Sequence, residues 1–596
     1  MGLRLRAGSD LAQSTPPLST NRQLSDPNLN KLVADQHVGI FVRKPVRLVV
    51  VVLFQVLLCS IARAETRFEI SYDKAVASGP LTGRVILVIT RSERPEPRFQ
   101  IGPNATPIFG VDAENLQLGQ TAVIDQSTFG HPAQSISQLP AGEYFVQAML
   151  NVYTKCQRSD GRTLWVHWDM GGRFFTMSPG NLYSDVQKVR LDPTAGYNVK
   201  LTLNKTVPPV DPQKDTNWVK HVQIKSELLS KFWGVPVYLR ATVVLPKGFN
   251  EHPDVRYPAV YAQGYVGSPA FYFNEDPASA KQQEGLRASS NVQPGYEFFQ
   301  EWTSDRFPRF LLVTFVEPSA FFPDGYGVNS ANNGPYGDAV TQELIPYVEK
   351  QFRAIGKAHG RLLEGASTGG WGSLGLQLKY PDFFGGAWVF NPDPIDFRKY
   401  QLINIYEDEN AFTAPGRSWV PADRPMRRSA EGQVNLTVRQ VTEFESVLGS
   451  KGRSGYQFNA WEAVYGPVGS DGYPRPLWDP RTGKIDREVA FYMRDNGYDL
   501  RHYAEKNWQT LGPKLAGKLH FIAGDMDNFY LNLAVYLFDD FTKQTSNPKS
   551  DATFEYGRPM KGHSWHSKNF ADMLREMAEQ VKKNTPSGES RAWAGY

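Results

Sequence analysis

The short segment of this chain that most suggests catalysis holds a serine between two glycines. Residues 365–369 read Gly-Ala-Ser-Thr-Gly and fit the pattern G-x-S-x-G, which places a serine on a sharp turn between a strand and a helix. Residues 361–364 predict such a strand, and residues 369–380 predict a helix that ends before Pro381. This context favours Ser367 as a nucleophile, and the alternative is a serine that caps the start of the helix.

A serine hydroxyl becomes a good nucleophile when a base takes its proton and an acid orients that base. In α/β-hydrolases the chain order of these groups is serine, acid, histidine. Residues 519–523 predict a strand, and Asp525 and Asp527 follow its end. We expect Asp527 to be the acid, with Asp525 as the alternative. A cation held by both aspartates and Asn528 is a third option, but the ligand spacing is incomplete and no metal site is predicted.

The base must be a histidine that comes after the last predicted strand. Residues 562–566 read Gly-His-Ser-Trp-His, and His563 directly follows a flexible glycine. We predict His563 as the base and keep His566 as the alternative, whose other role would be to contact the cap from a helix start. His359 and His520 precede or lie within strands, so a structural role is the simpler interpretation for both.

Two N–H donors must hold the negative oxygen of the tetrahedral intermediate. The backbone N–H of Thr368 follows the nucleophile at a helix start, and the second donor belongs to the loop 263–267 after a predicted strand. Within that loop we predict the N–H of Tyr265. Gly264 and Trp371 are candidates for the substrate pocket, and packing within the helix is the alternative role for Trp371.

The elements that must position these residues form a predicted α/β domain at 218–596. Apolar strands alternate with helices there, which predicts a mostly parallel sheet with helices on both faces. Residues 400–510 interrupt the alternation and are rich in Gly, Pro, Trp and Tyr. We expect this insertion to form a cap over the carboxyl edge of the sheet, where sites of open α/β sheets lie. A surface excursion without substrate contact is the alternative.

Two further regions precede the α/β domain. Residues 65–205 contain short runs of strand-forming residues separated by turn signals, which predict an all-β sandwich of immunoglobulin-like type. Residues 206–217 contain Pro208, Pro209 and Pro212 and predict a stiff linker. The β-sandwich could bind polysaccharide, pack against the cap or act as a spacer.

Residues 1–64 predict an extended N-terminus and a signal peptide. Basic residues at 43, 44 and 47 precede an apolar run over 48–62, and Ala62-Arg63-Ala64 fits a cleavage site of the form A-x-A. The run is shorter than the roughly 20 residues that span a bilayer. We therefore expect a secreted or periplasmic protein cleaved near Ala64, and an uncleaved N-terminal membrane anchor is the alternative.

The net charge and the number of cysteines limit the classes of partner and the cellular compartments that fit this protein. The 596 residues include 65 Lys or Arg and 61 Asp or Glu, a formal net charge of +4. Eight of the basic and three of the acidic residues lie in the predicted leader, so the remainder carries −1, and no nucleic-acid partner is expected. Of the two cysteines, Cys59 lies in the leader, which leaves Cys156 without an intramolecular partner. An exported protein without disulfides fits a bacterial origin.

Several segments in their order resemble the putative-esterase family of α/β-hydrolases, which includes esterase D, feruloyl esterases, enterochelin esterase and the antigen 85 mycolyltransferases. They are Asn-Gly-Pro-Tyr-Gly at 333–337, Glu-Leu-Ile-Pro-Tyr-Val-Glu at 343–349, Phe-Arg at 352–353, Glu-Gly-Ala-Ser-Thr-Gly-Gly at 364–370 and the histidine loop Gly-His-Ser-Trp at 562–565. The resemblance extends over about 255–395 and 515–570. Where the family often has His-Gly, this chain has Gln263-Gly264, so a side-chain role at that position does not carry over.

The resemblance implies ester hydrolysis through an acyl-enzyme without metal or organic cofactor. It supports Ser367 and His563, and it favours as acid the carboxylate three residues after Gly524, which is Asp527. We expect an exported serine esterase whose partner is a small-molecule or saccharide ester. The alternatives are a siderophore esterase of the enterochelin type, an acyltransferase, a peptidase of the same fold, and a binding protein with an inert hydrolase domain.

Overall fold

The computed structural model describes residues 65–596 except 170–171, 265–272, 280, 282–290, 415, 417–418 and 420–421. The predicted leader at 1–64 and Tyr265 therefore lie outside the described residues. Arg63–Tyr596 form one compact unit. Within the described ranges, none of the helices combines the length and the apolar character that a bilayer crossing needs.

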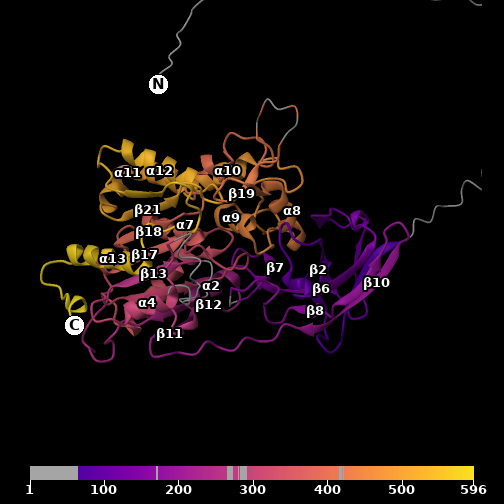
Figure 1. Cartoon of the computed structure of the whole chain (residues 1–596), viewed down its shortest axis with the longest axis horizontal. Coiled ribbons are helices and arrows are strands. Elements are labelled where there is room, and N and C mark those ends of the chain that lie inside the picture. The colour runs from indigo at the N-terminus through magenta and orange to yellow at the C-terminus, as the bar shows by residue number, and fades with distance from the viewer. Residues whose placement is uncertain are drawn as a thin grey trace, which may run out of the picture. The chain divides into compact units, whose positions relative to one another are not determined.

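The second half of the chain builds an eight-stranded sheet (Figure 1). Its strands, in spatial order, are β11 (Val219–Ser226), β12 (Val237–Val244), β14 (Leu311–Val316), β13 (Ala259–Gln263), β17 (Arg361–Ala366), β18 (Gly386–Phe390), β21 (Leu519–Gly524) and β22 (Thr553–Gly557). From β14 to β22 every neighbouring pair is parallel, whereas β11 and β12 are antiparallel additions. This is the sheet of an α/β-hydrolase-type fold, and the carboxyl ends of the parallel strands share one edge.

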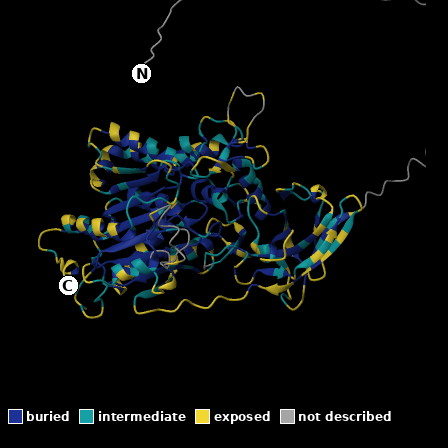
Figure 2. Cartoon of the chain, viewed as in Figure 1, coloured by how far each residue is buried: buried dark blue, intermediate teal, exposed yellow. Residues whose placement is uncertain are grey.

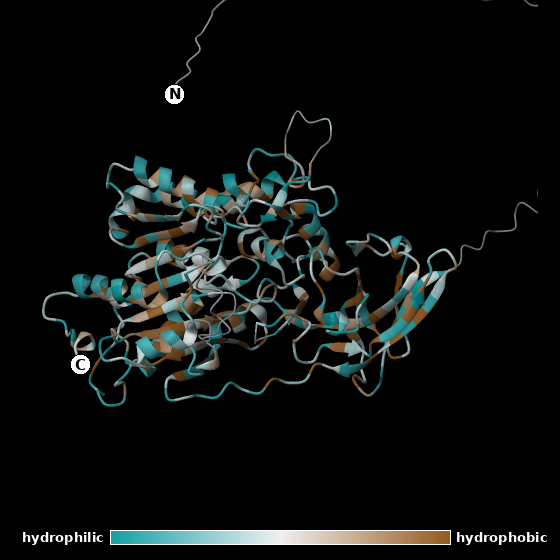
Figure 3. Cartoon of the chain, viewed as in Figure 1, coloured by the Kyte–Doolittle hydropathy of each residue, from teal (hydrophilic) through white to brown (hydrophobic). Residues whose placement is uncertain are grey.

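Helices alternate with the parallel strands as the sequence predicts. One group consists of α7 (Thr368–Lys379), α11 (Leu500–Leu511) and α12 (Asn532–Gln544), in which α11 contacts both other helices. A second group pairs α4 (Gly295–Trp302) with α13 (Phe570–Asn584). The central strands are buried and apolar, as the dark blue and brown ribbons of Figures 2 and 3 show, because helices cover the sheet.

Residues 400–510 form a folded insertion between β18 and β21. It contains a hairpin of β19 (Pro425–Arg428) and β20 (Val434–Thr437), followed by α8 (Val438–Leu448), α9 (Gln457–Tyr465) and α10 (Arg487–Asp495). Helix α9 is buried along most of its length and shares the hydrophobic core of the eight-stranded sheet. Many aromatic residues of the insertion are therefore part of a packed hydrophobic core.

The N-terminal β-rich region is joined by hydrogen bonds into one ten-stranded sheet. Its longest strands are β1 (Thr66–Tyr72), β2 (Leu81–Thr90), β3 (Ile108–Leu116), β6 (Gly142–Gln157) and β10 (Tyr197–Thr206). The first and last of these pair in parallel, although both lie far apart in the sequence. The β-rich character is confirmed, and the immunoglobulin-like type of the predicted sandwich is not confirmed, because hydrogen bonds join the strands into one path.

Strand β2 is buried on both faces because the insertion covers one of them. Val85, Leu87 and Ile89 face the core of the β-rich region. Ile86 and Val88 instead share a cluster with Phe444, Val447 and Leu448 of α8. The β-rich region thus packs against the insertion, which is one of the three roles that its sequence left open. Residues 208–216, which follow this region, are exposed and form no helix or strand.

Candidate active site

The glycine-flanked serine lies on a strained turn. Ser367 connects β17 to α7 with φ 58° and ψ −120°, a conformation that few residues other than glycine adopt. Its N–H donates to the carbonyl of Phe390 at 3.0 Å, which holds the turn against the end of β18. The side chain makes no capping hydrogen bond to α7, so the alternative role of a helix cap is not seen. Strain of this kind is typical of a nucleophile turn.

The two flanking glycines are required by close backbone contacts. A Cβ atom on Gly365 would lie 2.3 Å from the carbonyl oxygen of Gly369. A Cβ atom on Gly369 would lie 2.1 Å from the carbonyl oxygen of Gln263, at the end of β13. Both distances are far below a van der Waals contact, so any side chain at these positions would force the backbone apart.

The predicted acid and base are in direct contact. The Nδ1–H of His563 donates to Oδ2 of Asp527 at 2.6 Å. Asp527 is completely buried beyond the end of β21, and its Oδ1 accepts the N–H of Phe529 at 2.8 Å and that of Leu531 at 3.2 Å. The ring edge of Phe529 also packs against His563, with 4.9 Å between ring centroids. Position and orientation of the imidazole are therefore fixed from two sides.

Electrostatics favour the protonated form of this histidine. Burial lowers the pKa of His563, but the carboxylates of Asp527 and Asp393 outweigh it, and the pKa lies above its ordinary value. An imidazole in this setting is well suited to receive a proton and to hold it as a cation.

The two alternatives for acid and base have other contacts. Oδ1 of Asp525 accepts the N–H of Lys561 at 3.2 Å, and no histidine among the described residues bonds to it. The ring of His566 packs on Phe390, with centroids 4.6 Å apart. Burial, together with the nearby charge of His563, lowers the pKa of His566 to about 4. His566 is therefore neutral at physiological pH, and its ring packs the histidine loop against the end of β18.

A second buried carboxylate, Asp393, contacts the serine and was not singled out from the sequence. Its Oδ1 accepts the Ser367 hydroxyl at 3.3 Å. Its Oδ2 accepts hydrogen bonds from four side chains, those of Tyr326 at 2.6 Å, Trp461 at 2.9 Å, Gln457 at 3.0 Å and Thr368 at 3.3 Å. Asp393 follows the end of β18 by three residues, so the strand-end rule that selected Asp527 also pointed to it.

The histidine loop is tied to the same edge of the sheet. Asn391 donates from its side chain to the carbonyl of Trp565 at 3.2 Å and accepts the N–H of Gly524 at 2.9 Å. The loop that carries His563 is thereby fixed next to the end of β18, against which Ser367 is also held. In this arrangement the Ser367 hydroxyl points to Asp393, and no hydrogen bond to His563 occurs among the described residues.

The predicted oxyanion donors can be placed only in part. The N–H of Thr368 is the first of α7, where backbone N–H groups have no helical acceptor. Tyr265 lies outside the described residues, so its N–H is not placed. Gly264 is described, and a Cβ atom there would meet nothing within 4 Å.

Trp371, the other pocket candidate, is a core residue. It is wholly buried, with ring centroids 4.7 Å from Tyr465 and 5.7 Å from Tyr326. Its ring therefore packs the insertion against α7, as the packing alternative states. Across the described part of the chain, no three His, Cys, Asp or Glu side chains lie together so as to hold a metal ion.

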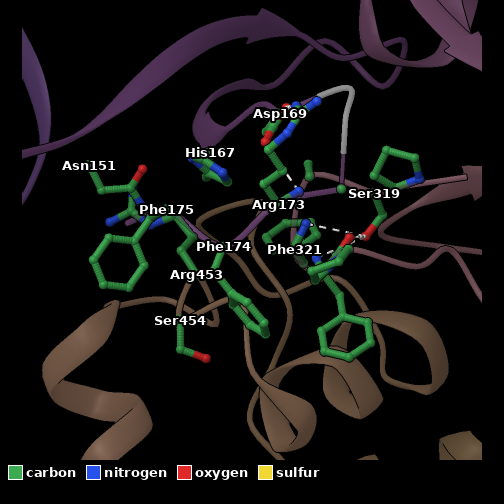
Figure 4. A pocket seen from close by; sticks show the side chains of 16 residues that line it. Asn151, His167, Asp169, Arg173, Phe174, Phe175, Ser319, Phe321, Arg453 and Ser454 are labelled. Carbon is green, nitrogen blue, oxygen red and sulfur yellow. Dashed lines mark hydrogen bonds and ion pairs between the residues drawn. The ribbon is translucent and has the colours of Figure 1, made fainter. Parts of the chain in front are cut away.

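A separate pocket lies where three parts of the chain meet (Figure 4). Side chains from the β-rich region, from the loop after β14 and from the insertion line it, among them His167, Arg173, Phe321 and Arg453. None of Ser367, Asp527 and His563 lines it. Its volume of about 20 Å³ suits a single water molecule, so it is a packing junction between the three parts.

A family model described as Putative esterase matches residues 323–442, and no curated protein matches the chain. Among solved structures, a ferulic acid esterase is 16% identical, and the overlap covers 62% of this chain and 99% of that one at a TM-score of 0.34. A fluorophosphonate-binding serine hydrolase of Staphylococcus aureus is 15% identical, with 61% and 98% covered and a TM-score of 0.28. An S-formylglutathione hydrolase of Agrobacterium tumefaciens is 14% identical, with 62% and 98% covered and a TM-score of 0.29.

The range matched by the family model contains the nucleophile turn, Asp393 and the hairpin of the insertion, whereas Asp527 and His563 lie beyond it. The resemblance to the putative esterase family that the sequence motifs predict is therefore confirmed, over residues 323–442.

Proposed function

We propose that this protein is a serine esterase that hydrolyses carboxylic esters with Ser367 as nucleophile, His563 as base and Asp527 as acid. The observation that carries the proposal is the hydrogen bond of 2.6 Å between His563 and a buried Asp527, at the same sheet edge as a serine on a strained turn. The match to the putative esterase family supports an ester hydrolase at the level of the family.

The reaction begins when the Ser367 hydroxyl turns from Asp393 to Nε2 of His563. As the serine oxygen bonds to the ester carbon, its proton passes to Nε2, and Asp527 stabilises the resulting imidazolium. The N–H groups of Thr368 and Tyr265 hold the negative oxygen of the tetrahedral intermediate. His563 then donates the proton to the leaving alcohol, which leaves an acyl group on Ser367.

Hydrolysis of the acyl-enzyme repeats these steps with water. His563 takes a proton from the attacking water, the second tetrahedral intermediate forms, and the proton returns to the serine oxygen as the carboxylic acid departs. The proposed substrate is a carbohydrate-linked or other external ester, and the proposed location is outside the cytoplasm, on the grounds of the N-terminal pattern at 1–64. A siderophore ester and acyl transfer to an alcohol remain outcomes that substrate profiling would distinguish.

The test is hydrolysis of p-nitrophenyl acetate by protein that begins at residue 65. Ser367→Ala removes the nucleophile, so kcat/KM should fall by about 10³-fold or more while the fold is kept. Ser373→Ala is the matched control, because Ser373 lies on the same helix with a buried hydroxyl that has no partner among the described residues. Equal activity in the parent protein and Ser367→Ala would refute the proposal and favour an inert binding protein.

A further inference from the structure

We propose that Asp393 is a positioning residue of this site, which accepts the hydroxyl of Ser367 through Oδ1 until that hydroxyl turns to His563, and which joins the nucleophile turn to helix α9 of the insertion through Oδ2. This inference rests on the proposed function. It adds a second acid to the serine, histidine and aspartate, and it gives the insertion a part in catalysis.

The two oxygens of Asp393 have different partners. Oδ2 receives donors from three separate places, namely Tyr326 in the loop after β14, Thr368 at the start of α7, and Gln457 and Trp461 on α9. Oδ1 receives only the Ser367 hydroxyl among the described residues. Because Oδ2 is held from several directions, the carboxylate cannot turn freely, and Oδ1 stays aimed at the serine.

The donors to this buried carboxylate are all neutral. No Lys or Arg side chain among the described residues lies within ion-pair distance of Asp393, although the residue is almost completely buried. Burying a charge without such a partner is costly, and several hydrogen bonds are needed to offset the cost. Five donors converge on its two oxygens, and the single oxygen of an amide could not accept them all. The site is therefore built for a carboxylate, whose charge has a use beside Ser367.

That use follows from the position of His563. Burial raises the pKa of Asp393, while the hydrogen bonds of Tyr326 and Trp461 and the charge of His563 act in the opposite direction. The carboxylate in turn favours the protonated form of His563, together with Asp527. When His563 takes the serine proton, the new imidazolium therefore lies between two carboxylates, one at Nδ1 and one beside the nucleophile.

Other charged or titratable groups also face this pair. Asp324, Tyr326, Tyr400 and Tyr465 interact electrostatically with Asp393, and Arg427 and His566 interact with His563. The buried Asp324 has a pKa raised to about 6, chiefly by burial. Since Arg427 disfavours the His563 cation, the two carboxylates are the groups that raise the pKa of this histidine.

The connection to the insertion runs through the first turns of α9. The carboxylate of Glu445 on α8 accepts the N–H groups of Phe458 and Asn459, both at 2.9 Å, and fixes the start of α9. Gln457 and Trp461 project from this anchored end onto Asp393. The insertion therefore helps to set the direction of the carboxylate that holds the nucleophile.

The decisive experiment compares the pH dependence of kcat/KM for Asp393→Asn with that of the parent protein, using p-nitrophenyl acetate. The amide carries no charge and has one acceptor oxygen in place of two, so it cannot serve both the serine hydroxyl and the donors at Oδ2. The low-pH limb of the profile should therefore move to lower pH, and kcat should fall by about 10–100-fold, with a smaller change in KM. Asp396→Asn is the control, because Asp396 is a buried carboxylate three residues away that bonds to Arg398 and does not contact Ser367. Its low-pH limb should stay where the parent protein has it.

The inference would be overturned if Asp393→Asn had the same kcat as the parent protein and its kcat/KM rose over the same range of low pH. Trp461→Phe and Gln457→Leu, which each remove one donor to Oδ2, provide a second test that does not depend on folding of Asp393→Asn. Each should lower kcat several-fold, and wild-type kcat in both would overturn the link to the insertion. If Ser367→Ala hydrolyses the ester as well as the parent protein, the proposed function itself fails, which is a separate outcome.

Discussion

Among single residues, the contact of His563 with Asp527 favours this carboxylate over Asp525 as the group that orients the imidazole. Asp527→Asn should lower kcat by about 10³–10⁴-fold, because the amide cannot stabilise the imidazolium and can favour the wrong tautomer. Asp525→Asn should change kcat only a few-fold, since Asp525 contacts the backbone of Lys561. Steady-state kinetics of the two variants provide the comparison, and a larger loss in Asp525→Asn would contradict the assignment.

The raised pKa of His563 also makes a prediction about pH. The base must be neutral to accept the serine proton, so kcat/KM should rise with pH through the pKa of His563. Because Asp527 and Asp393 raise this pKa, the midpoint should lie above 6.5, the ordinary value for histidine. A pH profile of kcat/KM measures it directly. A midpoint clearly below 6.5 would mean that burial outweighs the two carboxylates.

The proposed catalytic residues could be selected from the sequence because each follows a strand or opens a helix. The G-x-S-x-G pattern marks Ser367, and the end of a strand marks Asp527. Asp393 has the same strand-end signal, but its importance comes from partners in distant parts of the chain, namely Tyr326, Gln457 and Trp461. Tertiary contacts of this kind have no local sequence pattern.

Among the elements, the close approach of α7 to the ends of β13 and β17 limits which residues can replace Gly365 and Gly369. Gly369→Ala places a Cβ atom 2.1 Å from the carbonyl oxygen of Gln263, so the helix start and the strand end must separate. We expect a loss of at least about 1–3 kcal/mol in the free energy of unfolding, together with lower activity. Urea denaturation followed by circular dichroism measures the first effect.

Gly79→Ala is the matched control for this substitution, because a Cβ atom there meets nothing within 4 Å. Its free energy of unfolding should stay within about 0.5 kcal/mol of the parent value. Equal stability of Gly369→Ala and Gly79→Ala would show that the close contact at the turn is relieved without cost.

The elements themselves were predicted unevenly, for physical reasons. Buried parallel strands read as short apolar runs, so β13, β14, β17, β18 and β21 were visible in the sequence. In the insertion, aromatic residues and turn formers hide the helical period, and α8 and α9 were not foreseen. In the β-rich region, alternation indicates strands but not their partners, so the parallel pairing of β1 with β10 could not be predicted.

Across the whole molecule, a series of contacts leads from the β-rich region to Asp393 beside Ser367. The guanidinium of the buried Arg84 on β2 donates to the carbonyl of Val447 on α8 at 2.9 and 3.0 Å. Glu445 on the same helix anchors α9, and α9 reaches Asp393. The β-rich region therefore supports the insertion, and through it the direction of the Asp393 carboxylate.

Arg84→Ala tests this support. The substitution removes hydrogen bonds from a charged donor and an ion pair with Asp112, so the free energy of unfolding should fall by about 1.5–3 kcal/mol. We also expect a lower kcat, measured with p-nitrophenyl acetate, because α8 and α9 lose part of their anchor. Arg190→Ala, at an exposed position of the same region, should change neither quantity. Unchanged kcat in a destabilised Arg84→Ala would show that the β-rich region stabilises the fold without influencing the site.

Covalent labelling tests whether Ser367 is an activated nucleophile. Folded protein from residue 65 is incubated with an alkyl fluorophosphonate, and its intact mass and peptide masses are then determined. We expect one adduct per chain, on the peptide that contains Ser367, and none in Ser367→Ala. A folded protein that takes up no label, or an adduct that persists in Ser367→Ala, would contradict this expectation.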